Sequence, residues 1–231
     1  MSKLSDLETK LGIKFNDSKL LEEALTHRSF LNESREKKIK QNERLEFLGD
    51  AVLELAVTEF LFEKFPKKPE GELTALRAAL VNARTLFLVA DKLNLGNYLR
   101  MSKGEAKEKG KSRQVILADA VEALIGAIYL DKGTRPAEKF IKYYVCEMID
   151  GVLENKTWRD AKSLFQERSQ EFTGITPTYE VLSESGPDHK KHFAVGVYLE
   201  DELMAKGEGF SKQEAQVEAA EKALKVKGWG E

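Results

Sequence analysis

Apolar residues recur at helical spacing over the first two thirds of the chain. Between residues 18 and 30 they stand three or four positions apart. Longer apolar stretches follow at 42–65, 73–93 and 115–131. Pro136 fits the first turn of a last helix that runs to about residue 153. Because no segment up to residue 150 alternates with the period of two that is typical of a strand, this part of the chain is predicted to be all-helical.

The pattern changes beyond residue 153. Apolar side chains at Phe193, Val195, Val197 and Leu199 occupy every second position, which is the clearest strand signal in the chain. Ser211, followed three residues later by Glu214, forms a capping-box pattern that marks the start of a helix. The expected elements are a helix over 160–172, strands over 178–183, 192–199 and 203–207, and a helix over 212–227.

We therefore predict two domains of different fold class. An all-α domain is expected over residues 1–152 and a linker over 153–158. A small α+β domain of order α-β-β-β-α is expected over 159–228. The chain of 231 residues is 42% hydrophobic, which is enough apolar material for packed cores.

Several functional classes are disfavoured by composition. The single cysteine, Cys146, excludes an intrachain disulfide framework and a cysteine-based zinc site, and it fits a reducing cytoplasm. The sequence contains no apolar run of signal-peptide length or of membrane-spanning length, so no membrane association is expected. The net charge of −2 gives no bulk signal for nucleic acid.

Two pairs of acidic residues lie in the most apolar helices. Glu46 and Asp50 are four residues apart, and Asp119 and Glu122 are three apart, so each pair shares one helix face. Their neighbours are apolar around most of the helix, and a buried carboxylate needs a cation or hydrogen-bond donors. Oxygen ligands alone suit Mg²⁺ or Mn²⁺ rather than zinc. Acids at this spacing are more often a solvated helix face, and spacing alone does not show that the two helices meet.

Four blocks of the sequence resemble the ribonuclease III family in order and spacing, at residues 25–29, 42–53, 70–74 and 116–124. The resemblance implies a cytoplasmic endonuclease that hydrolyses double-stranded RNA with Mg²⁺, for which Mn²⁺ substitutes, and leaves 5′-phosphate and 3′-hydroxyl ends. It implies no organic cofactor and a role in rRNA and mRNA processing. The alternative from another class is a non-catalytic protein that binds double-stranded RNA.

The resemblance also implies roles for individual residues. Four catalytic carboxylates, which also bind the metal, fall on Glu46, Asp50, Asp119 and Glu122. Glu43 and Glu70 match acidic positions near the cleavage centre. Phe47 matches an aromatic residue that packs into the partner of a homodimer, although an ordinary core phenylalanine is the alternative. Val115 stands where the family often has serine, and it leaves the acids intact.

The last 70 residues resemble a double-stranded-RNA-binding domain at 160–167, 186–189 and 211–215. Such a domain contacts two minor grooves and the phosphates between them. The resemblance implies RNA contacts by Gln166, Glu167, His189, Lys190 and Lys212. Solvated surface lysines remain the alternative for Lys190 and Lys212. Gln213 departs from the family, which usually has a second lysine at this position.

The distribution of charge is unexpected for such a domain. Residues 158–231 hold ten basic and fourteen acidic side chains and carry −4, whereas residues 1–157 hold 27 and 25 and carry +2. If the C-terminal domain binds RNA, its cations must gather on one face. The basic residues between Lys103 and Arg113 are interpreted as a mobile charged loop, and His27 as a structural residue.

Overall fold

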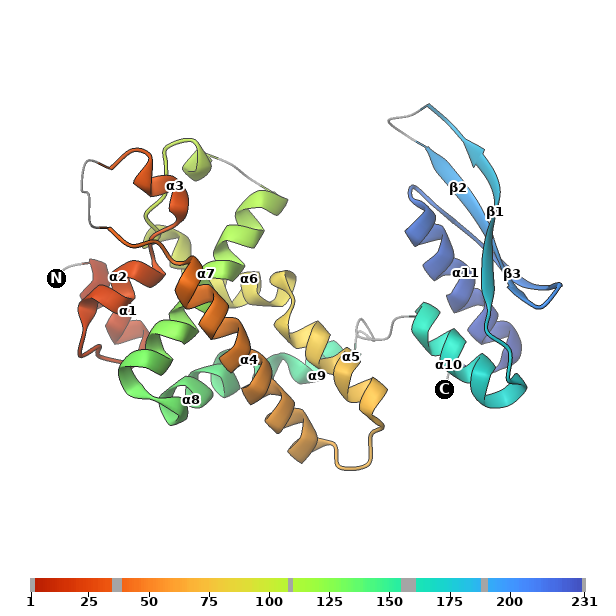
Figure 1. The fold of residues 1–231 in the computed structure, drawn as a ribbon, viewed down its shortest axis with the longest axis horizontal. Coiled ribbons are helices and arrows are strands. Elements are labelled where there is room, and N and C mark those ends of the chain that lie inside the picture. Colours follow the sequence, from red (N-terminus) through yellow and green to blue (C-terminus); the bar gives the residue numbers. More distant parts are fainter. Residues whose placement is uncertain (1–2, 35–38, 108–109, 155–160, 188–190, 230–231) are drawn as a thin grey trace. The chain divides into compact units, whose positions relative to one another are not determined.

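The chain forms two compact units, residues 1–158 and 159–231 (Figure 1). A computed structural model describes residues 3–34, 39–107, 110–154, 161–187 and 191–229. Most of the predicted linker, residues 155–158, lies outside the described residues. The predicted fold classes are confirmed: a helical domain precedes an α+β domain.

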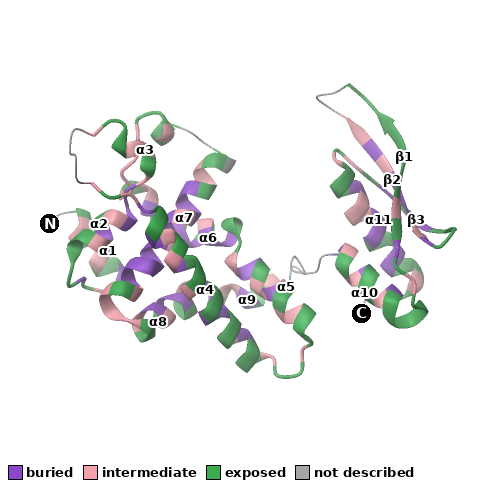
Figure 2. Ribbon diagram, in the orientation of Figure 1, coloured by how far each residue is buried: buried purple, intermediate pink, exposed green. Residues whose placement is uncertain are grey.

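Where the structure describes unit 1, it is built from helices. They are α1 (Lys3–Leu11), α2 (Ser18–Ala24), α3 (Arg28–Leu31), α4 (Glu43–Lys64), α5 (Glu70–Val81), α6 (Ala83–Lys92), α7 (Lys111–Lys132), α8 (Thr134–Tyr144) and α9 (Ile149–Glu154). Short 3₁₀ turns lie at Leu95–Asn97, Glu105–Lys107 and Cys146–Met148. The most buried helix of unit 1 is α7, against which α2, α4, α6 and α8 pack (Figure 2).

The single helix predicted over residues 18–30 is wrong, because it is two helices. The segment between α2 and α3 leaves the helix to pair with the chain near Arg100. The Arg100 N–H donates to the carbonyl of Leu25 at 2.8 Å, and the His27 N–H donates to the carbonyl of Arg100 at 2.9 Å. These long-range bonds replace the local helical ones, and a sequence window does not reveal them.

Two more predicted helices are divided. The stretch 73–93 bends by 43° between α5 and α6. Asn82 is extended at this bend, with ψ of 159°, and its side chain caps α6 by accepting the Thr85 N–H at 2.9 Å. The predicted last helix breaks at Val145, before α9. The N-terminal α1 was not predicted.

Unit 2 is a three-stranded antiparallel sheet with two helices. Its elements are α10 (Ala161–Thr173), β1 (Thr178–Ser185), β2 (His192–Leu199), β3 (Glu202–Gly209) and α11 (Lys212–Lys227), and the strand order is β1-β2-β3. The apolar positions of β2 face the core as predicted, since Val195 and Val197 are fully buried. The helix start is also confirmed, because the Ser211 hydroxyl oxygen accepts the Glu214 N–H at 3.1 Å.

No helix in the described part of the chain is by itself long and apolar enough to cross a membrane, whereas the bent pair of α5 and α6 meets the length and composition requirement when taken together.

Candidate metal centre

The helices α4 and α7 cross in direct backbone contact. A Cβ atom on Gly49 of α4 would lie 1.7 Å from the carbonyl oxygen of Glu122. A Cβ atom on Gly126 of α7 would lie 2.2 Å from the carbonyl oxygen of Leu45. Both distances are far inside van der Waals contact, so only glycine fits at either position while the helices keep this separation.

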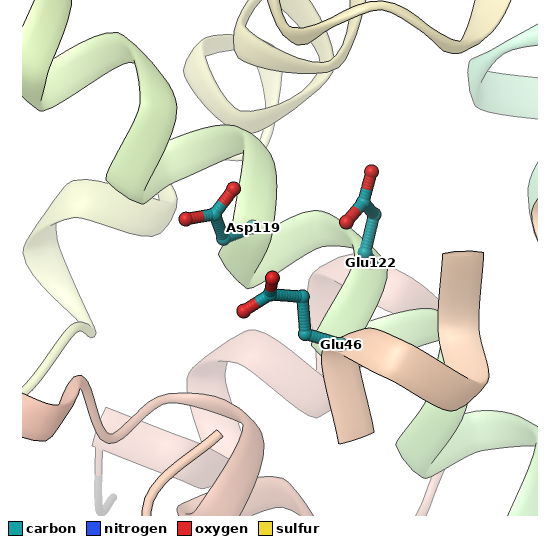
Figure 3. A group of neighbouring side chains, drawn as sticks. All are labelled: Glu46, Asp119 and Glu122. Atoms are coloured by element: carbon teal, nitrogen blue, oxygen red, sulfur yellow. The ribbon is translucent and has the colours of Figure 1, made fainter. Parts of the chain in front are cut away.

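The crossing brings the two predicted acidic pairs together. Glu46 lies one turn before Gly49, and Asp119 and Glu122 lie on the facing part of α7. Carboxylate oxygens of these three residues lie within 4.8 Å of one another, and all three residues are half-buried (Figure 3). The structure thus shows what spacing alone left open, namely that the two helices meet at their acidic faces.

Asp50, the fourth predicted acid, is exposed and lies outside this group of three. It is still close enough for its charge to raise the pKa of Glu122 and of Glu46. Asp50 therefore borders the cluster on its solvent side.

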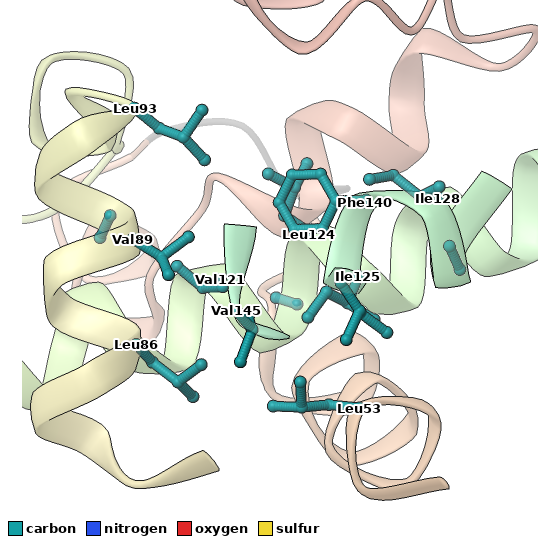
Figure 4. Close-up of a cluster of buried hydrophobic side chains, with 14 of the residues drawn as sticks. Leu53, Leu86, Val89, Leu93, Val121, Leu124, Ile125, Ile128, Phe140 and Val145 are labelled. Carbon is teal, nitrogen blue, oxygen red and sulfur yellow. The ribbon is translucent and has the colours of Figure 1, made fainter. Parts of the chain in front are cut away.

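The core holds α7 in place behind the cluster. Leu53 of α4 and Val121, Leu124 and Ile125 of α7 are fully buried, and Phe140 of α8 belongs to the same buried cluster (Figure 4). Side chains in such a core are close-packed and resist displacement. The carboxylates consequently project from a rigid support.

Burial raises the pKa of all three acids, and repulsion by neighbouring carboxylates adds to this effect at Glu46 and Glu122. Burial, followed by the charges of Asp50, Asp119 and Glu46, raises the pKa of Glu122 to about 8. Burial and the charge of Asp119 raise the pKa of Glu46. Burial also raises the pKa of Asp119. A divalent cation would relieve this repulsion, and a cluster of carboxylate oxygens suits a hard ion. The residues therefore fit a metal ion of this class.

His27 lies near the cluster, although the sequence indicated only a structural role. Its Nδ1 lies 2.8 Å from the Ser29 hydroxyl and accepts the Ser29 N–H at 3.3 Å. The same hydroxyl oxygen accepts the Ser102 N–H at 3.0 Å. The charge of His27 opposes the effect of burial on the pKa of Asp119. The imidazole reaches this place because the chain leaves the helix at residues 25–27, which the sequence pattern did not predict.

The two secondary acids differ in position. Glu43 forms an ion pair with Arg28 at 3.5 Å, and its charge raises the pKa of Glu46. Glu70 is exposed at the start of α5 and accepts a hydrogen bond from the Thr74 hydroxyl at 2.9 Å. It is not among the charges that act on Glu46 or Glu122. Within one chain, the structure brings Glu43 to the cluster and leaves Glu70 apart.

Phe47 is not an ordinary core residue, because 82% of it is exposed. It follows Glu46 on α4, and Leu55 and Phe62 of the same helix are exposed by 59% and 72%. This helix therefore presents three large apolar side chains to solvent.

The predicted RNA contacts of unit 2 are described only in part. Gln166 and Glu167 are exposed on α10. Lys212 is in the first turn of α11, and its Nζ lies 3.1 Å from Glu184 Oε1. His189 and Lys190 lie outside the described residues.

Comparison with known proteins assigns both units to families. Residues 17–149 match the model described as ribonuclease-III-like, and residues 161–227 match the double-stranded RNA binding motif. The chain is 47% identical to ribonuclease 3 of Clostridium botulinum, over 96% of this chain and 95% of that protein. The chain belongs to the ribonuclease III family.

Other relatives agree with this assignment. Ribonuclease 3 of a Nitratiruptor species is 46% identical, over 98% of this chain and 97% of that protein. The solved nuclease domain of ribonuclease III from Campylobacter jejuni is 47% identical with a TM-score of 0.57, covering 64% of this chain and 96% of that domain. Unit 1 is thus a ribonuclease III catalytic domain, and it is followed by a double-stranded-RNA-binding domain.

Replacing Glu122 by glutamine is expected to stabilise the metal-free protein at alkaline pH. An unfolded glutamate has a pKa of about 4.3, whereas the pKa of Glu122 in the folded protein is about 8. Between these values the folded state retains a proton that the unfolded state has lost, so the free energy of unfolding falls as the pH rises. The loss is complete above the folded pKa. Because Glu122 is partly solvated, we expect Glu122→Gln to recover about 1–2 kcal/mol there.

The measurement is urea unfolding in EDTA at about pH 5 and about pH 8.5, because most of the fall in the free energy of unfolding occurs between these two values. Glu63→Gln, an exposed change on the same helix as Glu46, is the matched control and should keep the wild-type pH dependence. If the free energy of unfolding of Glu122→Gln had the same pH dependence as that of the wild type, Glu122 would not be the cause of the loss of stability.

Proposed function

We propose that this ribonuclease III hydrolyses double-stranded RNA at the carboxylate cluster of α4 and α7 with a bound Mg²⁺ ion, for which Mn²⁺ substitutes. The observation that carries the proposal is the convergence of Glu46, Asp119 and Glu122 within 4.8 Å. It lies in the domain that matches the ribonuclease-III-like model. No organic cofactor is included, since hydrolysis at a metal centre requires none.

Each carboxylate has a distinct place in this proposal. Glu122, Glu46 and Asp119 would hold the ion, and Glu122 would be its most direct ligand. A bound divalent cation supplies a water of lowered pKa and offsets charge on the phosphate. The exposed Asp50 would orient water or the RNA backbone at the rim, with Glu43 farther out. Glu122 would release its proton when the ion binds, so metal affinity would rise with pH.

The products follow from the bond that breaks. The oxygen of water attacks the phosphorus, the bond from phosphorus to the 3′ oxygen breaks, and that oxygen takes up a proton. The new ends are a 5′-phosphate and a 3′-hydroxyl. We assign rRNA and mRNA precursors as the substrates. We assign the cytoplasm as the location, and the single, buried free cysteine supports this location.

The proposed RNA contacts of unit 2 are Gln166, Glu167, His189, Lys190 and Lys212. Support comes from the exposure of Gln166 and Glu167 and from the position of Lys212 at the start of α11. Lysine charge and free backbone N–H groups both favour a phosphate at a helix start.

We also propose that the protein is a homodimer that uses Phe47 as a contact. The exposed apolar side chains of α4 support this, because large exposed apolar patches mark interaction surfaces. A further Campylobacter jejuni structure, of the nuclease domain of ribonuclease III, is described as flexible in a region involved in dimer formation. Two copies would supply two centres, one for each strand of a duplex.

Cleavage of a long RNA duplex in the presence of Mg²⁺ tests the enzymatic proposal. We expect the wild type to cut and Glu122→Gln to cut at least about 100-fold more slowly, because a ligand of the metal is lost. Glu63→Gln should cut like the wild type. A 5′-phosphate-dependent exonuclease should degrade the products.

Two outcomes of this assay would contradict the proposal. A wild type that binds the duplex and never cuts it would favour the non-catalytic RNA-binding alternative. A Glu122→Gln variant with wild-type rates would overturn the assigned role of the cluster.

Truncation of Phe47 tests the dimer. Central aromatic contacts contribute about 2 kcal/mol or more to an interface, so Phe47→Ala should raise the dimer dissociation constant by about 30-fold or more. Sedimentation equilibrium measures this constant. Leu130→Ala on α7, which removes a side chain exposed by 54%, is the control and should leave it unchanged. A wild type that sediments as a monomer at micromolar concentration would contradict the proposal.

A further inference from the structure

One carboxylate in unit 2 contacts two lysines near the proposed RNA surface. Glu184 Oε1 lies 3.1 Å from Lys212 Nζ, and Glu184 Oε2 lies 4.0 Å from Lys191 Nζ. Lys212 begins α11, and Lys191 precedes β2. Glu184 is near the end of β1, within reach of both lysines.

The sheet fixes this arrangement. Glu184 pairs with Phe193 in the register of β1 and β2. The Nζ of Lys212 lies 5.6 Å from the centre of the Phe193 ring. Lys212 therefore packs over the ring while its ammonium group meets the Glu184 carboxylate, and the Ser211 cap holds the start of the helix beside them. The fold thus places Lys212 and Glu184 side by side.

The ion pair between Glu184 and Lys212 would affect RNA binding because unit 2 has fewer basic than acidic side chains. Residues 158–231 carry a net charge of −4, and Gln213 follows Lys212 where a second lysine would add attraction. RNA affinity depends on lysines and arginines that neutralise phosphates and release counterions. Lys212 is already paired with Glu184, whose carboxylate oxygen lies 3.1 Å from the lysine Nζ. A phosphate that approaches Lys212 is therefore also repelled by the negative charge of Glu184.

We propose that Glu184 sets the RNA affinity of this domain by competing with RNA phosphates for Lys212. The inference rests on the proposed RNA contact of Lys212. The pair is solvent-exposed, with 57% of the Lys212 side chain and 41% of the Glu184 side chain accessible, so RNA can displace the carboxylate. The displaced carboxylate remains beside the phosphate and weakens the complex.

The consequence is a gain of function on removing a charge. We expect Glu184→Gln to tighten duplex binding by about 3- to 10-fold at low salt, and to steepen the slope of log K against log salt by up to about one. The gain should require Lys212. In a Lys212→Gln background, Glu184→Gln should change affinity by less than about 2-fold.

The experiment is fluorescence anisotropy of the full chain with a labelled RNA duplex longer than ~16 bp, the span of one such domain. EDTA prevents cleavage. The variants are Glu184→Gln, Lys212→Gln and the double variant. Glu180→Gln is the matched control, since Glu180 is exposed on the same strand and forms no ion pair with the residues that the structure describes. Glu184→Ser provides a second substitution, and circular dichroism verifies folding.

The outcomes separate the two proposals. If Lys212→Gln binds RNA with unchanged affinity, the proposal that Lys212 contacts RNA is wrong. If Lys212→Gln weakens binding but neither Glu184 variant tightens it, the competition is overturned. It is also overturned if Glu180→Gln tightens binding equally, or if the gain persists without Lys212, because net charge alone would then explain it.

Discussion

The catalytic domain depends on the backbone contact between α4 and α7 at Gly49 and Gly126. Packed helices ordinarily stand about 8–10 Å apart because side chains separate them. Here a Cβ atom at either glycine would overlap a carbonyl oxygen of the other helix. The contact brings Glu46 within reach of Asp119 and Glu122, and the core behind α7 prevents the helices from moving apart. The position of the carboxylate cluster, the candidate metal centre, is thus a consequence of helix packing.

The same geometry makes the site costly without a cation. Three half-buried carboxylates repel one another, and the pKa of Glu122 rises to about 8. Unit 2 shows a related use of charge, because Glu184 is placed against Lys212. In both units the proposed function depends on the arrangement of a few charges. The net charge of −2, which taken alone argues against nucleic acid, reports neither arrangement.

Local signals in the sequence predicted much of the fold. Apolar periodicity predicted the helical domain, alternation predicted β2, and the Ser211 cap predicted the start of α11. The paired acids were also recognisable. Features that depend on distant segments were not predicted: the breaks at residues 25–27 and at Asn82, and the position of His27. Glycine destabilises the interior of a helix, so its presence there usually has a packing reason. Gly49 and Gly126 therefore indicated a close contact, although the sequence does not show which segment each one contacts.

The central claim, that the glycine contact creates the metal centre, is tested most directly by Gly49→Ala. Gly71→Ala in α5 is the control, because its Cβ would meet nothing within 4 Å. The measurement is the rise in melting temperature caused by a saturating concentration of Mn²⁺, relative to EDTA. The account predicts that Gly49→Ala loses this rise and is destabilised by about 1–3 kcal/mol or more in EDTA, whereas Gly71→Ala keeps the wild-type response. A Gly49→Ala variant with wild-type stability and a wild-type response to Mn²⁺ would contradict it.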